Sequence, residues 1–216
     1  MGRNQTALKA TLLAACTVTF VLALPVASAE LNPTAYYFMY GKLIGERNIH
    51  IGDPDNWDVA LDGLNGTTDS GKLTVRPGDY LGEDKALFGT WSKQKVKGQV
   101  AIYGPTINLA AYEDNSALVF EVNVIRPSNK PVMLGMDCHY PCRSEFDIRR
   151  ELKRYPKNEW ATFAVPLNCF TLSEDAGDFD ISRINGPFLL STEGRMEIAI
   201  ANIRLALLPE GDPGCR

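Results

Sequence analysis

The sequence predicts an all-β chain that folds as a jelly-roll β-sandwich with one short helical segment. Three observations support this class. From Tyr36 onward the apolar stretches are short, and Gly, Pro, Asn and Asp interrupt them at regular intervals. Several of these stretches alternate with the two-residue period of a half-buried strand. Helical periodicity is confined to a single segment. Short strands joined by turn-rich loops are typical of antiparallel sandwiches and jelly rolls.

The first 29 residues have the pattern of a secretory signal peptide. A basic start with Arg3 and Lys9 precedes an apolar run over residues 11–24, and Ala27-Ser28-Ala29 has the small residues of a cleavage site. The apolar run is shorter than the roughly 20 residues that a membrane-spanning helix needs, so we expect no membrane span. We expect cleavage before Glu30, which leaves residues 30–216 as a single domain in the periplasm or outside the cell.

A lipid anchor is a minor alternative for this segment. Residues 13–16, LAAC, have the residue types of a lipoprotein cleavage box, in which Cys16 would carry the lipid. The apolar run continues beyond Cys16 instead of ending there, which favours the ordinary signal peptide.

The charge of the remaining chain disfavours nucleic acid as a partner. Residues 1–29 contain two of the 22 basic residues and none of the 26 acidic ones, so residues 30–216 carry a net charge of −6. Nucleic acids and anionic lipids bind through clustered Lys and Arg side chains. An acidic chain of this kind is expected to have other partners.

Nine segments have strand-like patterns. In the fifth, Leu118, Phe120, Val122 and Val124 share one face, and the alternation of the last breaks near Asn202, which predicts a β-bulge. The predicted strands are 36–44, 71–75, 86–91, 98–104, 117–125, 131–137, 160–167, 187–192 and 196–207. One segment, 145–155, places apolar residues at helical spacing between two prolines, and one or two helical turns fit there.

Four cysteines remain after cleavage, and an exported chain with an even number is expected to form disulfides. Cys138 and Cys142 enclose Pro141, which favours a turn, so we predict that these two pair. The pairing of Cys169 and Cys215 is left open. A zinc site that includes His139 would need a second pair of ligands nearby, and a redox site would favour C-x-x-C. Both are weaker interpretations than a disulfide-closed turn.

Five further stretches occur in a fixed order: WDVALDGLN from Trp57, EDKALFGTWS from Glu83, MDCHYPC from Met136, NEWATFAVPLNCF from Asn158 and INGPFLLSTEGRMEIAIANIRL from Ile184. Together they resemble the ExoP galactose-binding-like domain. This family is usually the C-terminal appendage of bacterial exo-β-glucanases and β-glucosidases of glycoside hydrolase family 3. The resemblance implies a galactose-binding-like jelly roll in a bacterial envelope or secreted protein. The catalytic domains of those hydrolases have no counterpart here, since a (β/α)8 barrel alone takes about 250 residues.

No arrangement of catalytic residues stands out. The sequence contains no G-x-S-x-G, no phosphate-binding glycine loop and no H-E-x-x-H, and its two histidines are His50 and His139. A pair of carboxylates could still serve a glycosidase, but no spacing identifies one. We therefore expect a protein that binds rather than catalyses.

Sugar binding requires an aromatic face for the C–H patch of a pyranose and polar side chains for its hydroxyls. The candidates are Trp57, Tyr140, Trp91 and Tyr103. Trp57 lies in the polar DPDNWD stretch and Tyr140 in the cysteine turn, so these two are preferred. Trp91 and Trp160 lie at the end and start of predicted strands, where core packing is the common role.

Three aspartates, Asp53, Asp55 and Asp58, lie close together in the same polar stretch. Carboxylate oxygens in a loop are ligands that Ca²⁺ prefers, so a structural calcium is one interpretation. The stretch lacks the spacing and glycine of an EF-hand, and a solvated acidic turn is the other interpretation. No other cofactor is expected.

Three hypotheses follow. The first is an exported non-catalytic carbohydrate-binding module for a glucan or a cell-envelope glycan. The second is a module without a sugar site that docks on a glycoside hydrolase or another envelope protein. The third is a glycoside hydrolase in its own right.

Overall fold

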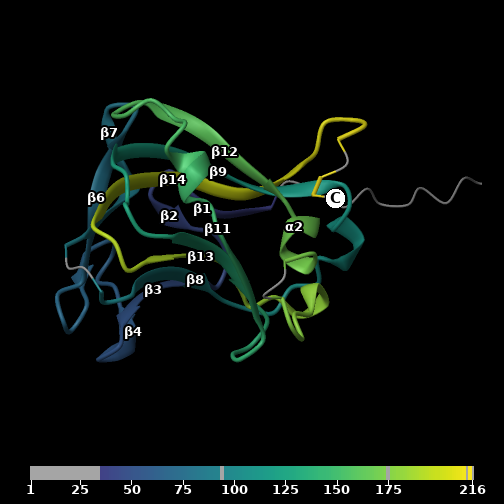
Figure 1. Ribbon diagram of the computed structural model, residues 1–216, viewed down its shortest axis with the longest axis horizontal. Coiled ribbons are helices and arrows are strands. Elements are labelled where there is room, and N and C mark those ends of the chain that lie inside the picture. The colour runs from purple at the N-terminus through teal and green to yellow at the C-terminus, as the bar shows by residue number, and fades with distance from the viewer. Residues whose placement is uncertain (1–34, 93–94, 174–175, 213, 216) are drawn as a thin grey trace, which may run out of the picture. The chain divides into compact units, whose positions relative to one another are not determined.

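Two antiparallel sheets face each other in the computed structural model of the chain. The structure describes residues 35–92, 95–173, 176–212, 214 and 215. All of them belong to the unit Asn32–Arg216, so the predicted signal peptide lies outside the described residues. Figure 1 shows the two layers. The predicted all-β sandwich is confirmed.

The larger sheet has eight strands. Its order is β12 (Trp160–Pro166), β9 (Ser116–Arg126), β14 (Met196–Leu207), β7 (Glu83–Trp91), β6 (Leu73–Tyr80) and β5 (Gly66–Thr67). β1 (Tyr36–Met39) pairs with β14 and with β2 (Lys42–Leu43). The central pairing of β9 and β14 joins the two longest strands of the structure, and the sequence of both alternates in the two-residue period.

The smaller sheet has six strands and carries the candidate functional site. Its order is β11 (Arg143–Asp147), β10 (Val132–Asp137), β13 (Gly186–Thr192), β8 (Gly98–Tyr103), β3 (Asn48–Asp53) and β4 (Asn56–Ala60). β4 and β11 are therefore its two edge strands. Helical structure in the described residues is limited to α1 (Arg149–Leu152), α2 (Asn168–Thr171) and the 3₁₀ turns η1 (Ala110–Tyr112) and η2 (Ile181–Arg183).

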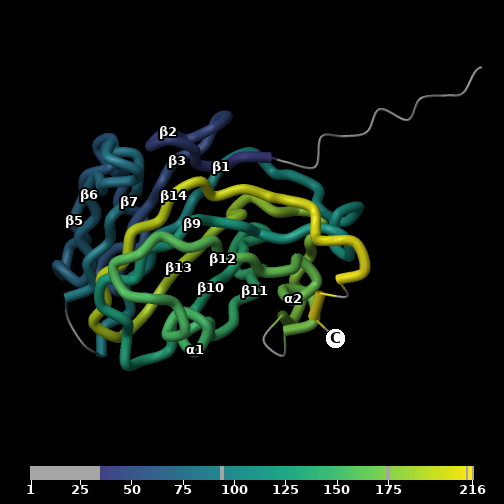
Figure 2. Tube along the Cα trace, turned by 90° about the horizontal axis from the view of Figure 1, so that it is seen from above, coloured from purple at the N-terminus to yellow at the C-terminus, as the bar shows by residue number. Residues whose placement is uncertain are grey.

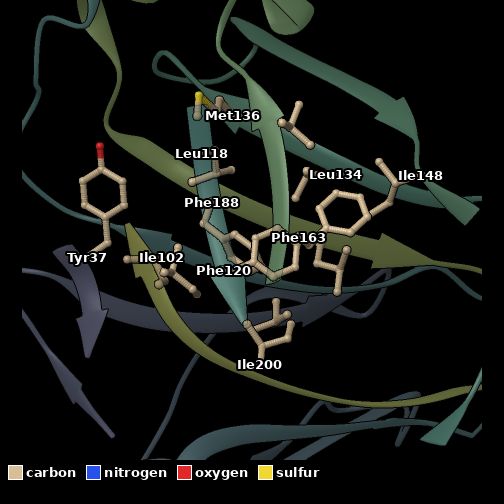
Figure 3. Packing of buried hydrophobic residues seen from close by; sticks show 14 of the residues in the cluster. Tyr37, Ile102, Leu118, Phe120, Leu134, Met136, Ile148, Phe163, Phe188 and Ile200 are labelled. Carbon is tan, nitrogen blue, oxygen red and sulfur yellow. The ribbon is translucent and has the colours of Figure 1, made fainter. Parts of the chain in front are cut away.

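The core lies between the sheets and is built from the inward faces of the alternating strands. Phe120 of β9 stacks on Phe163 of β12 with ring centroids 5.1 Å apart, and it meets Phe188 of β13 edge to face at 5.4 Å. Figure 3 shows these three rings with Leu118, Leu134 and Ile200 around them. Since aromatic side chains bury the most apolar area, this cluster links the two sheets at their centre.

Several predicted elements are confirmed and some are wrong. The bulge lies where the sequence places it, since Asn202 has a φ of +51° and the register with β9 shifts between Ala201 and Arg204. The helix predicted over 145–155 is confined to α1, because residues 143–147 form β11 and pair with β10. β3 and β4 are absent from the prediction because their sequences, NIHIGD and NWDVA, are polar and short.

Two disulfides tie the fold. Cys138 pairs with Cys142, as predicted, and Cys169 pairs with Cys215, whose pairing the sequence left open. The second bridge joins α2 to the C-terminal residues, and Figure 2 shows the chain returning to α2 at its end. Among the described residues, no helix has the length and apolar character that a membrane crossing requires.

Removing the two bridges should have unequal effects. Cys169–Cys215 joins residues 46 positions apart, whereas Cys138–Cys142 spans only four. In the chain-entropy model the first constrains the unfolded chain by about 4 kcal/mol and the second by about 2 kcal/mol. We expect the double variant Cys169→Ala with Cys215→Ala to lose more free energy of unfolding in urea than Cys138→Ala with Cys142→Ala. Equal losses would contradict this account.

Lys72 directly precedes β6 of the larger sheet, and its side chain is a buried cation. Its side chain is fully buried and its Nζ donates to the carbonyl oxygen of Gly194 at 2.7 Å. Burial lowers the pKa of Lys72 from 10.5 to about 8. Between these two pH values the unfolded chain holds a proton that the folded chain has released, so the stability that Lys72 contributes rises with pH. The wild-type protein should therefore gain stability across this window relative to Lys72→Met. Parallel urea-unfolding profiles for the two proteins would exclude the effect.

Candidate functional site

An open cleft of about 550 Å³ lies on the outward face of the six-stranded sheet. Its lining includes three of the four aromatic candidates, Trp57, Tyr103 and Tyr140. The other lining residues are Lys97, Gln99 and Arg143. Alternation along β8 explains the composition, because Val100 and Ile102 point into the core while Gln99 and Tyr103 face outward.

Small residues keep the middle of this face low. Gly135, Leu189, Ala101 and His50 lie side by side in the register across β10, β13, β8 and β3. Two of these four positions carry a side chain no larger than a methyl group. The middle of this face is the floor of the cleft. Trp57 and Tyr140 lie at its sides, on the edge strand β4 and in the turn after β10, whereas Tyr103 of β8 belongs to the floor.

Trp57 forms one wall. It lies on the edge strand β4, not in a loop as the sequence suggested, and 47% of its surface is exposed. β4 approaches β3 closely because residue 52 is glycine, and a Cβ there would lie 2.6 Å from the Cα of Trp57. On the same strand Asp58 pairs with His50, whose ring meets that of Tyr103 edge to face at 5.8 Å.

Tyr140 forms the opposite wall and is 82% exposed. It sits in the disulfide turn, where Tyr140–Pro141 is a cis peptide and the amide of Cys138 donates to the carbonyl of Cys142 at 2.8 Å. The backbone amide of His139 donates to Asn185 Oδ1 at 2.7 Å, and the ring atom Nε2 of His139 lies 2.7 Å from Thr106 Oγ1. The turn is thus held at several points while the Tyr140 ring stays exposed, with Arg143 Cζ 6.0 Å from its centroid.

A buried carboxylate organises the floor between the walls. Asp137 of β10 is 1% exposed and binds the Nε and Nη2 atoms of Arg143, the latter at 2.9 Å. Tyr103 donates its hydroxyl to Asp137 Oδ2 at 2.5 Å. Burial and the Asp137 carboxylate raise the pKa of Tyr103, so this hydroxyl keeps its proton. Arg143 also donates to Gln99 Oε1 at 3.2 Å, which fixes the amide at the cleft surface.

The fourth aromatic candidate lies elsewhere. Trp91 is 1% exposed, and its indole nitrogen donates to the carbonyl of Gly98 at 2.9 Å. It is a core residue and offers no face to a ligand, so its choice as a binding candidate is wrong. Trp160 packs against Tyr80 on the eight-stranded sheet, with centroids 4.8 Å apart.

The three aspartates do not form a ligand set. Asp53 is fully buried and accepts hydrogen bonds from the hydroxyl and amide of Ser70, at 2.6 and 3.1 Å, and from the amide of Asp55 at 3.1 Å. Burial raises the pKa of Asp53, but these hydrogen bonds outweigh it and lower the pKa to about 2. Asp58 points to His50 instead. Within the described ranges, no three His, Cys, Asp or Glu side chains are grouped as metal ligands, so the calcium interpretation is not retained.

The polar residues of the cleft were missed by sequence reasoning. Lys97, Gln99, Asp137 and Arg143 come from three separate stretches, and only the cross-strand register brings them together. One signal existed, since the alternation in GQVAIY places Gln99 and Tyr103 on the same face.

Comparisons with known proteins agree with this architecture. The Exop_C family model, described as a galactose-binding domain-like family, matches residues 48–205. The extra C-terminal domain of the exo-1,3/1,4-β-glucanase ExoP from a Pseudoalteromonas species superposes with a TM-score of 0.64 at 16% identity, covering 84% of this chain and 98% of that domain. In the whole enzyme the match covers 88% of this chain and only 22% of the hydrolase, at 17% identity and a TM-score of 0.64.

A carbohydrate-binding module has the same fold. The family 30 module of the cellulosomal cellulase Cel9D-Cel44B of Clostridium thermocellum gives a TM-score of 0.55 at 13% identity, covering 83% of this chain and 99% of the module. No curated protein sequence matches this chain. At these identities the structural likeness concerns the fold.

Proposed function

Because the chain belongs to the Exop_C family of galactose-binding-like domains, as its sequence resemblance implied, we propose that it is a non-catalytic carbohydrate-binding module. Its ligand is a β-linked glucan, held in the cleft between Trp57 and Tyr140. The solved relatives of its fold include a carbohydrate-binding module and an accessory domain of a glucanase. These relatives support the class, and the cleft supports the site.

One observation carries the proposal, namely that two exposed aromatic rings flank a pre-formed polar floor in a single cleft. Trp57 and Tyr140 supply faces for the C–H patches of sugar rings, and Gln99 and Arg143 supply groups for their hydroxyls. Since Asp137 already fixes Arg143, little side-chain freedom is lost when a sugar binds. An open cleft of this kind can hold a segment of a polysaccharide chain.

The choice of glucan is drawn from the relatives. One is part of an exo-1,3/1,4-β-glucanase and another is part of a cellulase. Cations of the cleft are paired with carboxylates, Arg143 with Asp137 and Lys97 with Glu145, so the cleft has no excess positive charge for an acidic polysaccharide. A neutral glucan fits both observations.

Affinity electrophoresis tests the proposal. The purified protein is run through native gels that contain barley β-1,3/1,4-glucan, hydroxyethyl cellulose or laminarin, beside a gel without polysaccharide and with serum albumin as reference. Retardation in at least one glucan gel is the expected result. Unretarded migration in all of them would contradict the proposal.

Export belongs to the same proposal. The signal-peptide pattern of residues 1–29 and the two disulfides both suit an oxidising compartment outside the cytoplasm. Amino-terminal sequencing of protein from the periplasm or the medium should begin at Glu30. An intact amino terminus in the cytoplasmic fraction would contradict it.

A docking role is the second candidate function. The turns of the β1–β2 and β6–β7 hairpins expose Tyr40 (54%) and Leu81 (77%), and Lys85 Nζ lies 5.2 Å from the centroid of the Tyr40 ring. Neighbouring exposed apolar side chains often mark protein contacts. Self-association in sedimentation velocity that Tyr40→Ser with Leu81→Ser abolishes would favour this role over glycan binding.

A further inference from the structure

A second, smaller pocket of about 270 Å³ adjoins the cleft on the same sheet. Lys97 lines both, so its side chain forms the boundary between them. The lining comes from β10, β11 and β13 and includes Met133, Glu145 and Ser191. The pocket therefore continues the floor of the cleft across the sheet.

Two polar atoms in this pocket lack hydrogen-bond partners within the part of the chain that the structure describes. Ser191 is fully buried, and its Oγ has no partner among those residues. Glu145 binds Lys97 through Oε1 at 3.1 Å, but its buried Oε2 accepts no hydrogen bond from them. Arg143 Nη1 is 3.9 Å from Oε2, too far for a hydrogen bond. Since folded proteins rarely leave buried polar atoms unpaired, such atoms call for an explanation.

The two polar atoms lie in the same pocket as apolar side chains, and this combination indicates which kind of ligand the pocket can hold. A carboxylate oxygen accepts hydrogen bonds, and a serine hydroxyl both donates and accepts. Met133 and Pro131 add an apolar wall. A sugar unit presents hydroxyl groups along its edge and C–H groups on its face, and so matches both surfaces. The Glu145 carboxylate would repel the acid group of a uronate, so the pocket disfavours an acidic sugar.

We propose that this pocket is a second sugar subsite, which takes the next unit of the oligosaccharide bound in the cleft. Glu145 Oε2 and Ser191 Oγ bind its hydroxyls. The Lys97 side chain changes position while it remains paired with Glu145, so that the oligosaccharide can extend from the cleft into the pocket. The inference rests on the proposed function, because it requires that the cleft binds a glycan. Its consequence is a preference for oligosaccharides long enough to fill both sites.

Titration calorimetry with the series from cellobiose to cellohexaose tests the subsite. Affinity for the wild-type protein should rise with length until both sites are filled. Glu145→Gln replaces the free acceptor by an N–H donor and should lower the affinity for the longest oligosaccharide about tenfold. Ser191→Ala should lower it about threefold and should not affect the shortest oligosaccharide that binds the wild-type protein. Glu145→Gln also weakens the salt bridge to Lys97 of the cleft, so the dependence on length is judged on Ser191→Ala.

Asn123→Ala is the matched control, because Asn123 Oδ1 is another buried atom without a hydrogen-bond partner among the described residues, on β9 of the other sheet. It should bind every oligosaccharide as the wild-type protein does. Thermal melting confirms that each variant is folded, and Ser191→Ala removes only a hydroxyl that has no partner in the described part of the fold.

The outcomes separate the two proposals. If Glu145→Gln and Ser191→Ala bind all lengths like the wild-type protein, the pocket is not a subsite and the cleft keeps its role. Laminari-oligosaccharides are titrated into the same variants in parallel, so that both linkage types are measured. If no glucan of either kind binds, the proposed function fails and the subsite fails with it.

Discussion

Replacing Trp57 by alanine should raise the Kd for soluble β-glucan by about thirty- to one-hundredfold, a loss of about 2 to 3 kcal/mol. Trp57 is the largest aromatic group of the cleft, and nearly half of it is exposed. Its backbone packs closely on Gly52 of β3, so the edge strand that carries the ring is held in place before a sugar arrives. Truncation removes this face without opening the core.

The matched control for Trp57 is Trp160→Ala. Trp160 is also a tryptophan on a strand, but it packs against Tyr80 on the outward face of the other sheet. Affinity electrophoresis in barley β-glucan should show the loss of retardation for Trp57→Ala alone. Equal retardation of Trp57→Ala and the wild-type protein would remove Trp57 from the site.

Asp137→Ala should strongly reduce the free energy of unfolding and should also weaken glycan binding. Asp137 is the buried acceptor for Arg143 and Tyr103. Without it the guanidinium of Arg143, whose side chain is only 20% exposed, loses its nearest counter-charge and, among the described residues, keeps only Glu145 at 3.9 Å. Breaking a buried ion pair in this way costs about 3 to 5 kcal/mol. The polar floor also loses the group that orients it.

The control variant Glu121→Ala distinguishes the loss of stability from the loss of glycan binding. Glu121 pairs with Arg204 at 3.1 Å on the other sheet, and the two side chains are 14% and 19% exposed. Urea unfolding should show destabilisation of both variants, with the larger loss for Asp137→Ala. Calorimetry under folding conditions should show weakened glycan binding for Asp137→Ala alone. Normal binding by folded Asp137→Ala would contradict the role of the floor.

The fold class was predictable because most strands of its core are apolar segments whose residues alternate between the two faces of the sheet. The segments that became β9, β12 and β14 carry a two-residue period that fixes which face is buried. β3, β4 and β11 were not predicted, because an edge strand or a strand with one solvent-exposed face contains polar residues, and such a sequence resembles that of a loop. Residues 145–147 also carry apolar spacing that fits a helix until their pairing with β10 is known.

The candidate site was predictable only in part. Exposure could be inferred for Trp57 and Tyr140 from their polar or turn-like surroundings, and both lie at the cleft. Trp91 could not be separated from them by residue type, and its burial depends on tertiary packing. The polar floor joins residues 34 and 44 positions apart, Tyr103 with Asp137 and Gln99 with Arg143. Such contacts follow from strand order, which local patterns do not specify.

The central claim is that a β-glucan binds the outward face of the six-stranded sheet. The most direct measurement is an NMR titration of ¹⁵N-labelled protein with a β-1,3/1,4-glucan oligosaccharide, followed through the backbone amides. The account predicts shifts for residues 57, 97–103, 140, 142 and 143, with none on the outward face of the eight-stranded sheet around Tyr80 and Trp160. Shifts confined to that other face, or no shifts for any oligosaccharide tested, would contradict it.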